Sequence, residues 1–155
     1  MSKPVRNKVL IDMDPGTDDA LALMMALNSP DLDVLGLTTV GGNARLAHTT
    51  RNALRLMDHL GRPDMPVSRG ASRPLRGNFS YGYHFHGPGG LTVRLPAGES
   101  KPVSTRAPEY IAKVAEQNQG ELVLIALGPL TNIARVILGE PRLPGWLREI
   151  VVMGG

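Results

Sequence analysis

Short apolar runs and longer segments with helical periodicity alternate along the chain. The apolar runs predict buried strands at residues 9–13, 34–40, 65–67, 122–127 and 150–153. The longer segments predict helices at residues 18–27, 44–60, 108–119 and 130–138, and a glycine follows each of the last three. Strands that alternate with helices predict an α/β fold with an open, mostly parallel, doubly wound sheet and helices on both faces.

Polar and glycine-rich segments follow four of the predicted strands. In open α/β sheets, ligands bind outside the carboxyl ends of the strands, so these segments mark the expected site. They are Asp14-Pro15-Gly16, Gly41-Gly42-Asn43, Gly128-Pro129 and Gly154-Gly155.

One segment shows neither periodicity. Residues 69–98 contain 7 Gly and no Asp or Glu, which predicts a long Gly-rich loop over residues 69–100. Loops of this length in compact proteins are usually functional, so we expect this one to lie near the active site.

The composition fits one compact, soluble α/β domain. The chain has 155 residues, of which 42% are hydrophobic and only 4% aromatic. Its net charge of +3 is scattered rather than gathered in a stripe, which argues against a nucleic-acid partner. The longest apolar run, residues 20–27, is too short to cross a membrane, and no signal peptide is evident. With no Cys, there are no disulfides or thiolate metal sites, and we expect a cytoplasmic protein.

Four aspartates lie within eight residues around the end of the first strand: Asp12, Asp14, Asp18 and Asp19. Like charges held this close are costly unless a cation neutralises them. Oxygen ligands without His or Cys favour Ca²⁺ or Mg²⁺ over zinc. Asp18 alone could serve only to cap the helix, but capping does not explain the two aspartates before it.

A dehalogenase-type phosphatase is one alternative for this cluster, because that family also carries Asp-x-Asp after its first strand. In that family a Thr or Val stands two residues after the second Asp. Here Gly16 occupies that place and Thr17 follows it. The alternative therefore fits less well but stays open.

The acidic segment Asp12-Met-Asp14-Pro-Gly-Thr-Asp18-Asp19-Ala resembles the signature of the inosine-uridine preferring nucleoside hydrolases. Further segments match in the expected order: residues 38–43 (TTVGGN), 86–91 (HGPGGL), 128–132 (GPLTN) and 153–155 (MGG). Members of that family are about twice as long as this chain, so the resemblance implies that residues 1–155 are the N-terminal part of a single nucleoside hydrolase domain.

The resemblance implies a Ca²⁺ cofactor and a ribonucleoside substrate. Asp14 and Asp19 match the family's calcium ligands, and Leu127 matches a position whose backbone carbonyl binds the metal. Asp14 also matches the base that takes a proton from the attacking water. Cleavage of an N-glycosidic bond passes through an oxocarbenium-like state, which agrees with an activated water as nucleophile.

The resemblance also implies how the substrate is held. Asp18 and Asn43 match residues that bind the ribose hydroxyls, and His86 matches a mobile loop that approaches the nucleobase. Further family ligands belong to the second half of the domain, so we expect little activity from this chain alone. The remaining alternatives are a non-catalytic calcium- or ribose-binding half-domain or a subunit of a split enzyme. The expected protein partner is a second copy in a homo-oligomer or the missing C-terminal half.

Overall fold

A computed structural model describes residues 6–154, so Gly155 of the last motif lies outside the described residues. The chain forms five strands in one parallel sheet of order β3-β2-β1-β4-β5. The strands are β1 (Asn7–Met13), β2 (Leu32–Thr39), β3 (Val67–Arg69), β4 (Val123–Ala126) and β5 (Glu149–Val152). The helices are α1 (Thr17–Asn28), α2 (Leu46–His59), α3 (Tyr83–His86), α4 (Ala107–Gln117), α5 (Thr131–Gly139) and α6 (Leu143–Trp146). The predicted doubly wound parallel sheet is confirmed.

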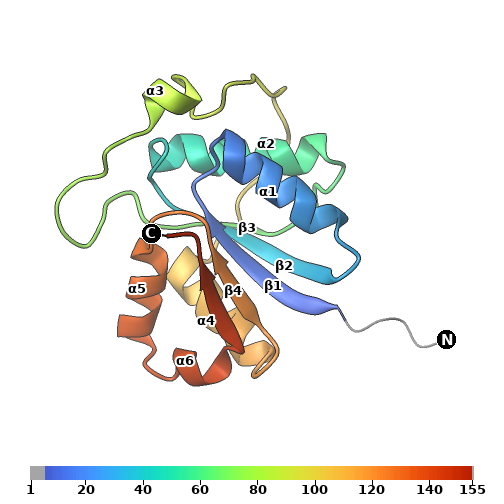
Figure 1. Ribbon diagram of the computed structural model, residues 1–155, viewed down its shortest axis with the longest axis vertical. Helices are drawn as coiled ribbons and strands as arrows, with labels where there is room; N and C mark the ends of the chain where they lie inside the picture. The colour runs from blue at the N-terminus through green and yellow to red at the C-terminus, as the bar shows by residue number, and fades with distance from the viewer. Residues whose placement is uncertain (1–5, 155) are drawn as a thin grey trace.

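The central strand β1 separates two hydrophobic cores. Val9, Ile11 and Met13 point to one face, where they pack with buried residues of α1 and α2. Leu10 points to the other face and packs with α4, α5 and α6. The sheet lies between these two groups of helices in Figure 1. Apolar residues on both faces of one strand are what a sheet covered on both sides requires.

The winding of the chain reverses at β1. The chain passes from β1 to β2 and β3 on one side, and then returns through α4 to β4 and β5 on the other. The connections that leave the carboxyl ends of β1 and β4 therefore run to helices in opposite layers. Between these two connections a crevice opens at this edge of the sheet. The crevice is where the candidate site lies.

Element boundaries differ from the predicted ones where backbone chemistry intervenes. The pattern predicts a third strand at 65–67, but β3 begins at Val67, because Pro66 has no N–H to give to a sheet ladder. Helix α2 ends one residue before the predicted boundary, and Gly61 after it takes a φ of +68°. The short helices α3 and α6 have only four residues each, too few to give a periodic signal.

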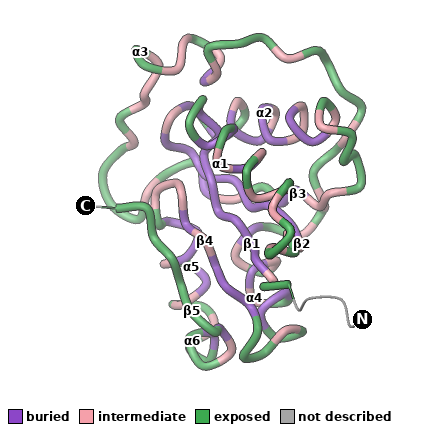
Figure 2. Tube along the Cα trace, turned by 45° about the vertical axis from the view of Figure 1, so that its right-hand side comes forward, coloured by how far each residue is buried: buried purple, intermediate pink, exposed green. Residues whose placement is uncertain are grey.

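The long segment after β3 and the edge strand β5 are the most exposed parts of the described chain (Figure 2). All four residues of β5 are exposed, and the apolar side chains of Ile150, Val151 and Val152 are 36%, 46% and 47% accessible. The predicted loop contains α3, and soon after the loop Val103 forms an isolated parallel bridge to Ser68 of β3. Within residues 6–154, no helix is long and apolar enough to cross a membrane.

Candidate active site

Asp14 lies directly after β1, between two glycine-containing turns that follow β2 and β4. A Cβ atom at Gly42 would collide with Oδ2 of Asp14, and one at Gly128 would lie 2.7 Å from Oδ1. Both turns therefore need glycine so that the backbone can approach the carboxylate closely. This packing leaves the Asp14 side chain almost fully buried, with 4% of the residue exposed.

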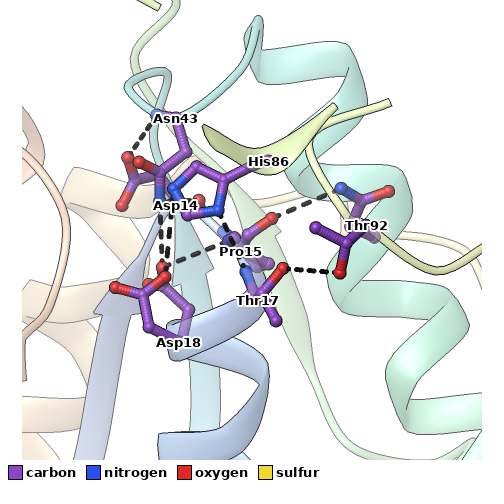
Figure 3. Close-up of polar contacts among 10 residues, drawn as sticks. Asp14, Pro15, Thr17, Asp18, Asn43, His86 and Thr92 are labelled. Carbon is purple, nitrogen blue, oxygen red and sulfur yellow. Dashed lines mark hydrogen bonds and ion pairs between the residues drawn. The ribbon is translucent and has the colours of Figure 1, made fainter. Parts of the chain in front are cut away.

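Asn43 connects the two aspartates that the sequence assigns to the metal. Its backbone N–H donates to Oδ2 of Asp14 over 2.5 Å (Figure 3). Its side-chain amide donates to the Asp14 carbonyl over 3.1 Å and to Oδ2 of Asp19 over 3.0 Å. One residue of the turn after β2 thus holds both carboxylates.

Asp19 is a buried residue in the first turn of α1. Its Oδ2 accepts the backbone N–H of Gly16, which is the N-cap residue of α1, over 3.1 Å. Its Oδ1 is buried and has no hydrogen-bond partner among the described residues. Capping therefore accounts for one oxygen of Asp19 and leaves the other free for a ligand.

The pKa values of both carboxylates are raised. The pKa of Asp14 is raised to about 8, mainly by burial and also by the negative charge of Asp19. Burial also raises the pKa of Asp19. Without a neutralising cation, the site disfavours two ionised carboxylates.

A cavity of about 360 Å³ opens at the carboxyl ends of β1, β4 and β5. Four residues assigned from the sequence line it together: Asp14, Asp18, Asn43 and Leu127. Asp19 is not part of the lining and lies behind it, linked through Asn43. The opposite wall comes from the end of β5 and the residues after it, Val152, Met153 and Gly154.

His86 lies over the acidic turn and not in the cavity wall. Its Nδ1 accepts the backbone N–H of Thr17 over 3.3 Å, and its Nε2 lies 4.0 Å from Oδ1 of Asp18 (Figure 3). The side chain of Asp18 is 63% exposed, so this pair is at the surface. His86, the site residue predicted in the long loop, thus brings this loop to the edge of the site.

Asp12, the first acid of the cluster, plays a different part from the others. It is fully buried between β2 and β4, where Oδ1 accepts hydrogen bonds from Thr38 over 2.5 Å and from Asn132 over 2.7 Å. Burial raises the pKa of Asp12 to about 6, although the two hydrogen bonds oppose the shift. Asp12 therefore does not line the cavity and instead connects β1 to β2 and α5 beneath it.

Sequence reasoning assigned no role to Asn132. Its amide also donates to the Thr39 carbonyl over 3.1 Å, and its Oδ1 accepts the N–H of Ala71 over 2.8 Å. The residue thereby ties α5 to the ends of β1 and β2 and to the start of the long loop. Its place in the Gly128–Asn132 motif was the only signal for it in the sequence.

The oxygen atoms at the site suit a hard cation, but they are too few to complete its coordination. Asp14, Asp19 and the Leu127 carbonyl offer oxygen ligands only, and the unpartnered Oδ1 of Asp19 is a buried acceptor without a donor. Within residues 6–154, no three His, Cys, Asp or Glu side chains come together as a metal site. Ca²⁺ takes about 6 to 8 oxygens, so these residues would leave most positions to other ligands.

The fold and the cavity define an α/β protein with an acidic ligand site at the carboxyl edge of a parallel sheet. A family model described as inosine-uridine preferring nucleoside hydrolase matches residues 9–155, and the chain belongs to this family. This is not the family of the dehalogenase-type phosphatases.

Curated relatives in this family are named as nucleosidases. The chain is 43% identical over 150 residues to uridine nucleosidase 1 of Arabidopsis thaliana, covering 96% of this chain and 45% of the relative. It is 40% identical over 148 residues to the pyrimidine-specific ribonucleoside hydrolase RihA of Klebsiella pneumoniae, covering 95% of this chain and 48% of the relative. The chain therefore spans about half the length of the curated relatives it matches.

Solved structures agree with this assignment. A plant nucleoside hydrolase superposes with a TM-score of 0.92 at 41% identity, covering 96% of this chain and 48% of that structure. A purine-preferring ribonucleoside hydrolase from Gardnerella vaginalis gives a TM-score of 0.91 at 33% identity, covering 96% and 48%. The fold of this chain is thus the fold of one half of such enzymes.

Proposed function

We propose that this chain is the N-terminal part of a nucleoside hydrolase domain that cleaves ribonucleosides with water into ribose and free base. The observation that carries the proposal is the convergence of Asp14, Asp18, Asn43 and Leu127 on one cavity at the sheet edge. The names of the relatives include uridine, pyrimidine and purine substrates. The proposal therefore extends to ribonucleosides as a class.

Asp14 is the proposed general base. Its carboxylate is buried, faces the cavity and is oriented by the N–H of Asn43, so its position is fixed before substrate binds. Held by Asp14, Asp19 and the Leu127 carbonyl, a calcium ion would supply Lewis acidity toward the attacking water. Asp14 would then take the proton of that water as its oxygen attacks the anomeric carbon and the bond to the base breaks.

Asp18 and Asn43 are the proposed ribose ligands. The carboxylate of Asp18 is exposed at the cavity and can accept hydrogen bonds from sugar hydroxyls. Asn43 gives its N–H groups to the two aspartates, and no donor among the described residues reaches its Oδ1. That oxygen is available to a hydroxyl. His86, above the same turn, is placed to approach the base from the loop side.

We further propose that catalysis needs protein groups beyond those in this chain. Three protein ligand positions are few for Ca²⁺, which has to repay the loss of its hydration shell. The exposed residues at the end of β5 form one wall of the cavity, so another segment or subunit could extend the site there. This makes a half-domain that binds calcium or ribose without turnover the second candidate function.

Base release and calcium binding, measured on the same preparation, test the proposed metal ligands and the proposed general base. The purified chain would be titrated with Ca²⁺ by calorimetry and incubated with inosine or uridine, with free base quantified by chromatography. Weak calcium binding with little base release is expected. Rapid base release that persists after Asp14→Asn would contradict the assignment of the general base, and absence of calcium binding at millimolar concentration would contradict the metal ligands.

A further inference from the structure

A second cavity lies behind the loop that covers the acidic turn. It has a volume of about 440 Å³ and is formed between α2 and the segment 88–95. Three arginines line it, Arg51 and Arg55 from α2 and Arg94 from the loop, together with Asn52 and Thr92. No Asp or Glu is among its lining residues.

The three arginines have no carboxylate partner within residues 6–154. Arg51 and Arg55 reach only backbone carbonyls, those of Gly89 and Leu95, each over a long 3.4 Å. Nε of Arg51 is buried and has no hydrogen-bond partner among the described residues. Buried donors of this kind are normally satisfied, so a missing acceptor at this point indicates a ligand.

An adjoining cavity of about 300 Å³ shares Arg51 and Arg55 and adds Arg69 to the cluster. It also contains one acid, Asp58. The Asp58 carboxylate accepts hydrogen bonds from the hydroxyl and the N–H of Ser100 and forms no ion pair with the arginines. Four arginines face this single carboxylate in the two cavities, so the net charge there is positive.

We propose that the cavity of Arg51, Arg55 and Arg94 binds the phosphate group of a small molecule. Guanidinium groups are planar forks that match the oxygens of phosphate, and several of them suit a dianion. The cavity is larger than a phosphate ion needs and is of the size that holds small ligands. Inorganic phosphate and a sugar phosphate share this chemistry. The site is separate from nucleoside hydrolysis and does not depend on it.

The cavity is connected to the acidic turn through two residues. The amide of Asn52 donates to the Gly89 carbonyl over 3.0 Å and to the Pro15 carbonyl over 3.3 Å. The hydroxyls of Thr92 and Thr17 lie 3.1 Å apart (Figure 3). A ligand that joins Arg94 to the arginines of α2 holds the segment 88–95 against this turn, and the same loop carries His86.

Calorimetry with inorganic phosphate and with ribose 5-phosphate tests the site on the full chain. The variant Arg55→Gln/Arg94→Gln removes two lining charges. Its matched control, Arg73→Gln/Arg76→Gln, removes two exposed charges from the same long loop outside both cavities. We expect the first variant to weaken binding at least tenfold and the control to change it less than twofold. Circular dichroism checks folding, and the single variant Arg94→Gln, at an exposed residue, replaces the double variant if that does not fold.

Equal weakening in the two variants would overturn the proposal, because it would mean that only net charge matters. Absence of binding by the unmodified chain at millimolar phosphate and ribose 5-phosphate would overturn it too. Tighter binding of ribose 5-phosphate supports a sugar phosphate as the occupant, and equal affinity supports the phosphate group alone. Hydrogen exchange supplies a second readout: ligand should slow exchange in residues 88–95, and unchanged exchange there would contradict the site.

Discussion

Gly128→Ala tests whether the position of the Asp14 carboxylate is set by close backbone approach. The new Cβ would lie 2.7 Å from Oδ1 of Asp14, 2.8 Å from Cγ1 of Val40 and 3.1 Å from the Asp14 nitrogen. Ordinary contacts begin at about 3.4 Å, so the carboxylate and Val40 have to move by roughly 0.6 to 0.7 Å. Asp14 has little room to do so, because Gly42 closes its other side and Asn43 holds Oδ2.

Overpacking of this kind costs about 1–3 kcal/mol of unfolding free energy. In a domain of this size each kcal/mol lowers Tm by roughly 2–4 °C. Calcium affinity should fall as well, because one of only three proposed protein ligands is displaced. In an active assembly, displacement of the base by such a distance should lower kcat by up to about 100-fold.

Gly139→Ala is the matched control, because a Cβ there meets no atom within 4 Å. It lies at the end of α5, so alanine should be neutral or should stabilise by up to about 1 kcal/mol. Thermal unfolding and calcium calorimetry on both variants give the comparison. If Gly128→Ala matched Gly139→Ala in Tm and calcium affinity, close backbone approach at Gly128 would not set the position of the Asp14 carboxylate.

Three further predictions concern the metal, the sugar and the exposed strand. Asp19→Ala should abolish calcium binding, whereas Asp12→Asn, beneath the cavity, should weaken it less; equal calorimetric affinities in Asp19→Ala and the unmodified chain would remove Asp19 from the ligands. Asn43→Ala should weaken ribonucleoside binding by roughly 1–3 kcal/mol, since it deletes the proposed hydroxyl partner and also the amide donor to the Asp19 carboxylate and the Asp14 carbonyl; an unchanged KM and kcat in an active assembly would exclude that role. Val151→Lys, at an exposed apolar residue of β5, should reduce self-association in sedimentation velocity with little change in Tm, and undiminished association would place the interface elsewhere.

The sheet and its layers could be predicted because the signals are local and repeated. The apolar run of β1 and the glycines after α2 and α4 are readable from the sequence alone. The boundary of β3 depends on which residue pairs with Leu37, and α3 and α6 are too short for any period. Those features are decided by tertiary pairing, which a periodic pattern does not encode.

The cavity lining could be predicted in large part, because Asp14, Asn43 and Leu127 all follow carboxyl ends of adjacent parallel strands. The distinction between Asp12 and Asp14 came from the family resemblance and not from the strand pattern. Both are acids near the end of β1, but Asp12 lies within the strand and is held by Asn132, whereas Asp14 follows the strand and faces the cavity. Nothing in the sequence indicated that Arg94 of the long loop lies beside the arginines of α2. Arg51 and Arg94 are 43 residues apart and meet only because the loop folds back onto α2.

Turnover in a completed domain tests the proposed function most directly. Residues 9–154 can replace the matching half of uridine nucleosidase 1 of Arabidopsis thaliana, which is 43% identical over this region. Release of free base from uridine and inosine would be measured with Ca²⁺, with a chelator, and in the Asp14→Asn variant of the same chimera. We predict base release that requires calcium and falls at least 100-fold in Asp14→Asn. A folded chimera that releases base equally well with chelator, or with Asn at position 14, would contradict calcium-dependent hydrolysis with Asp14 as the base.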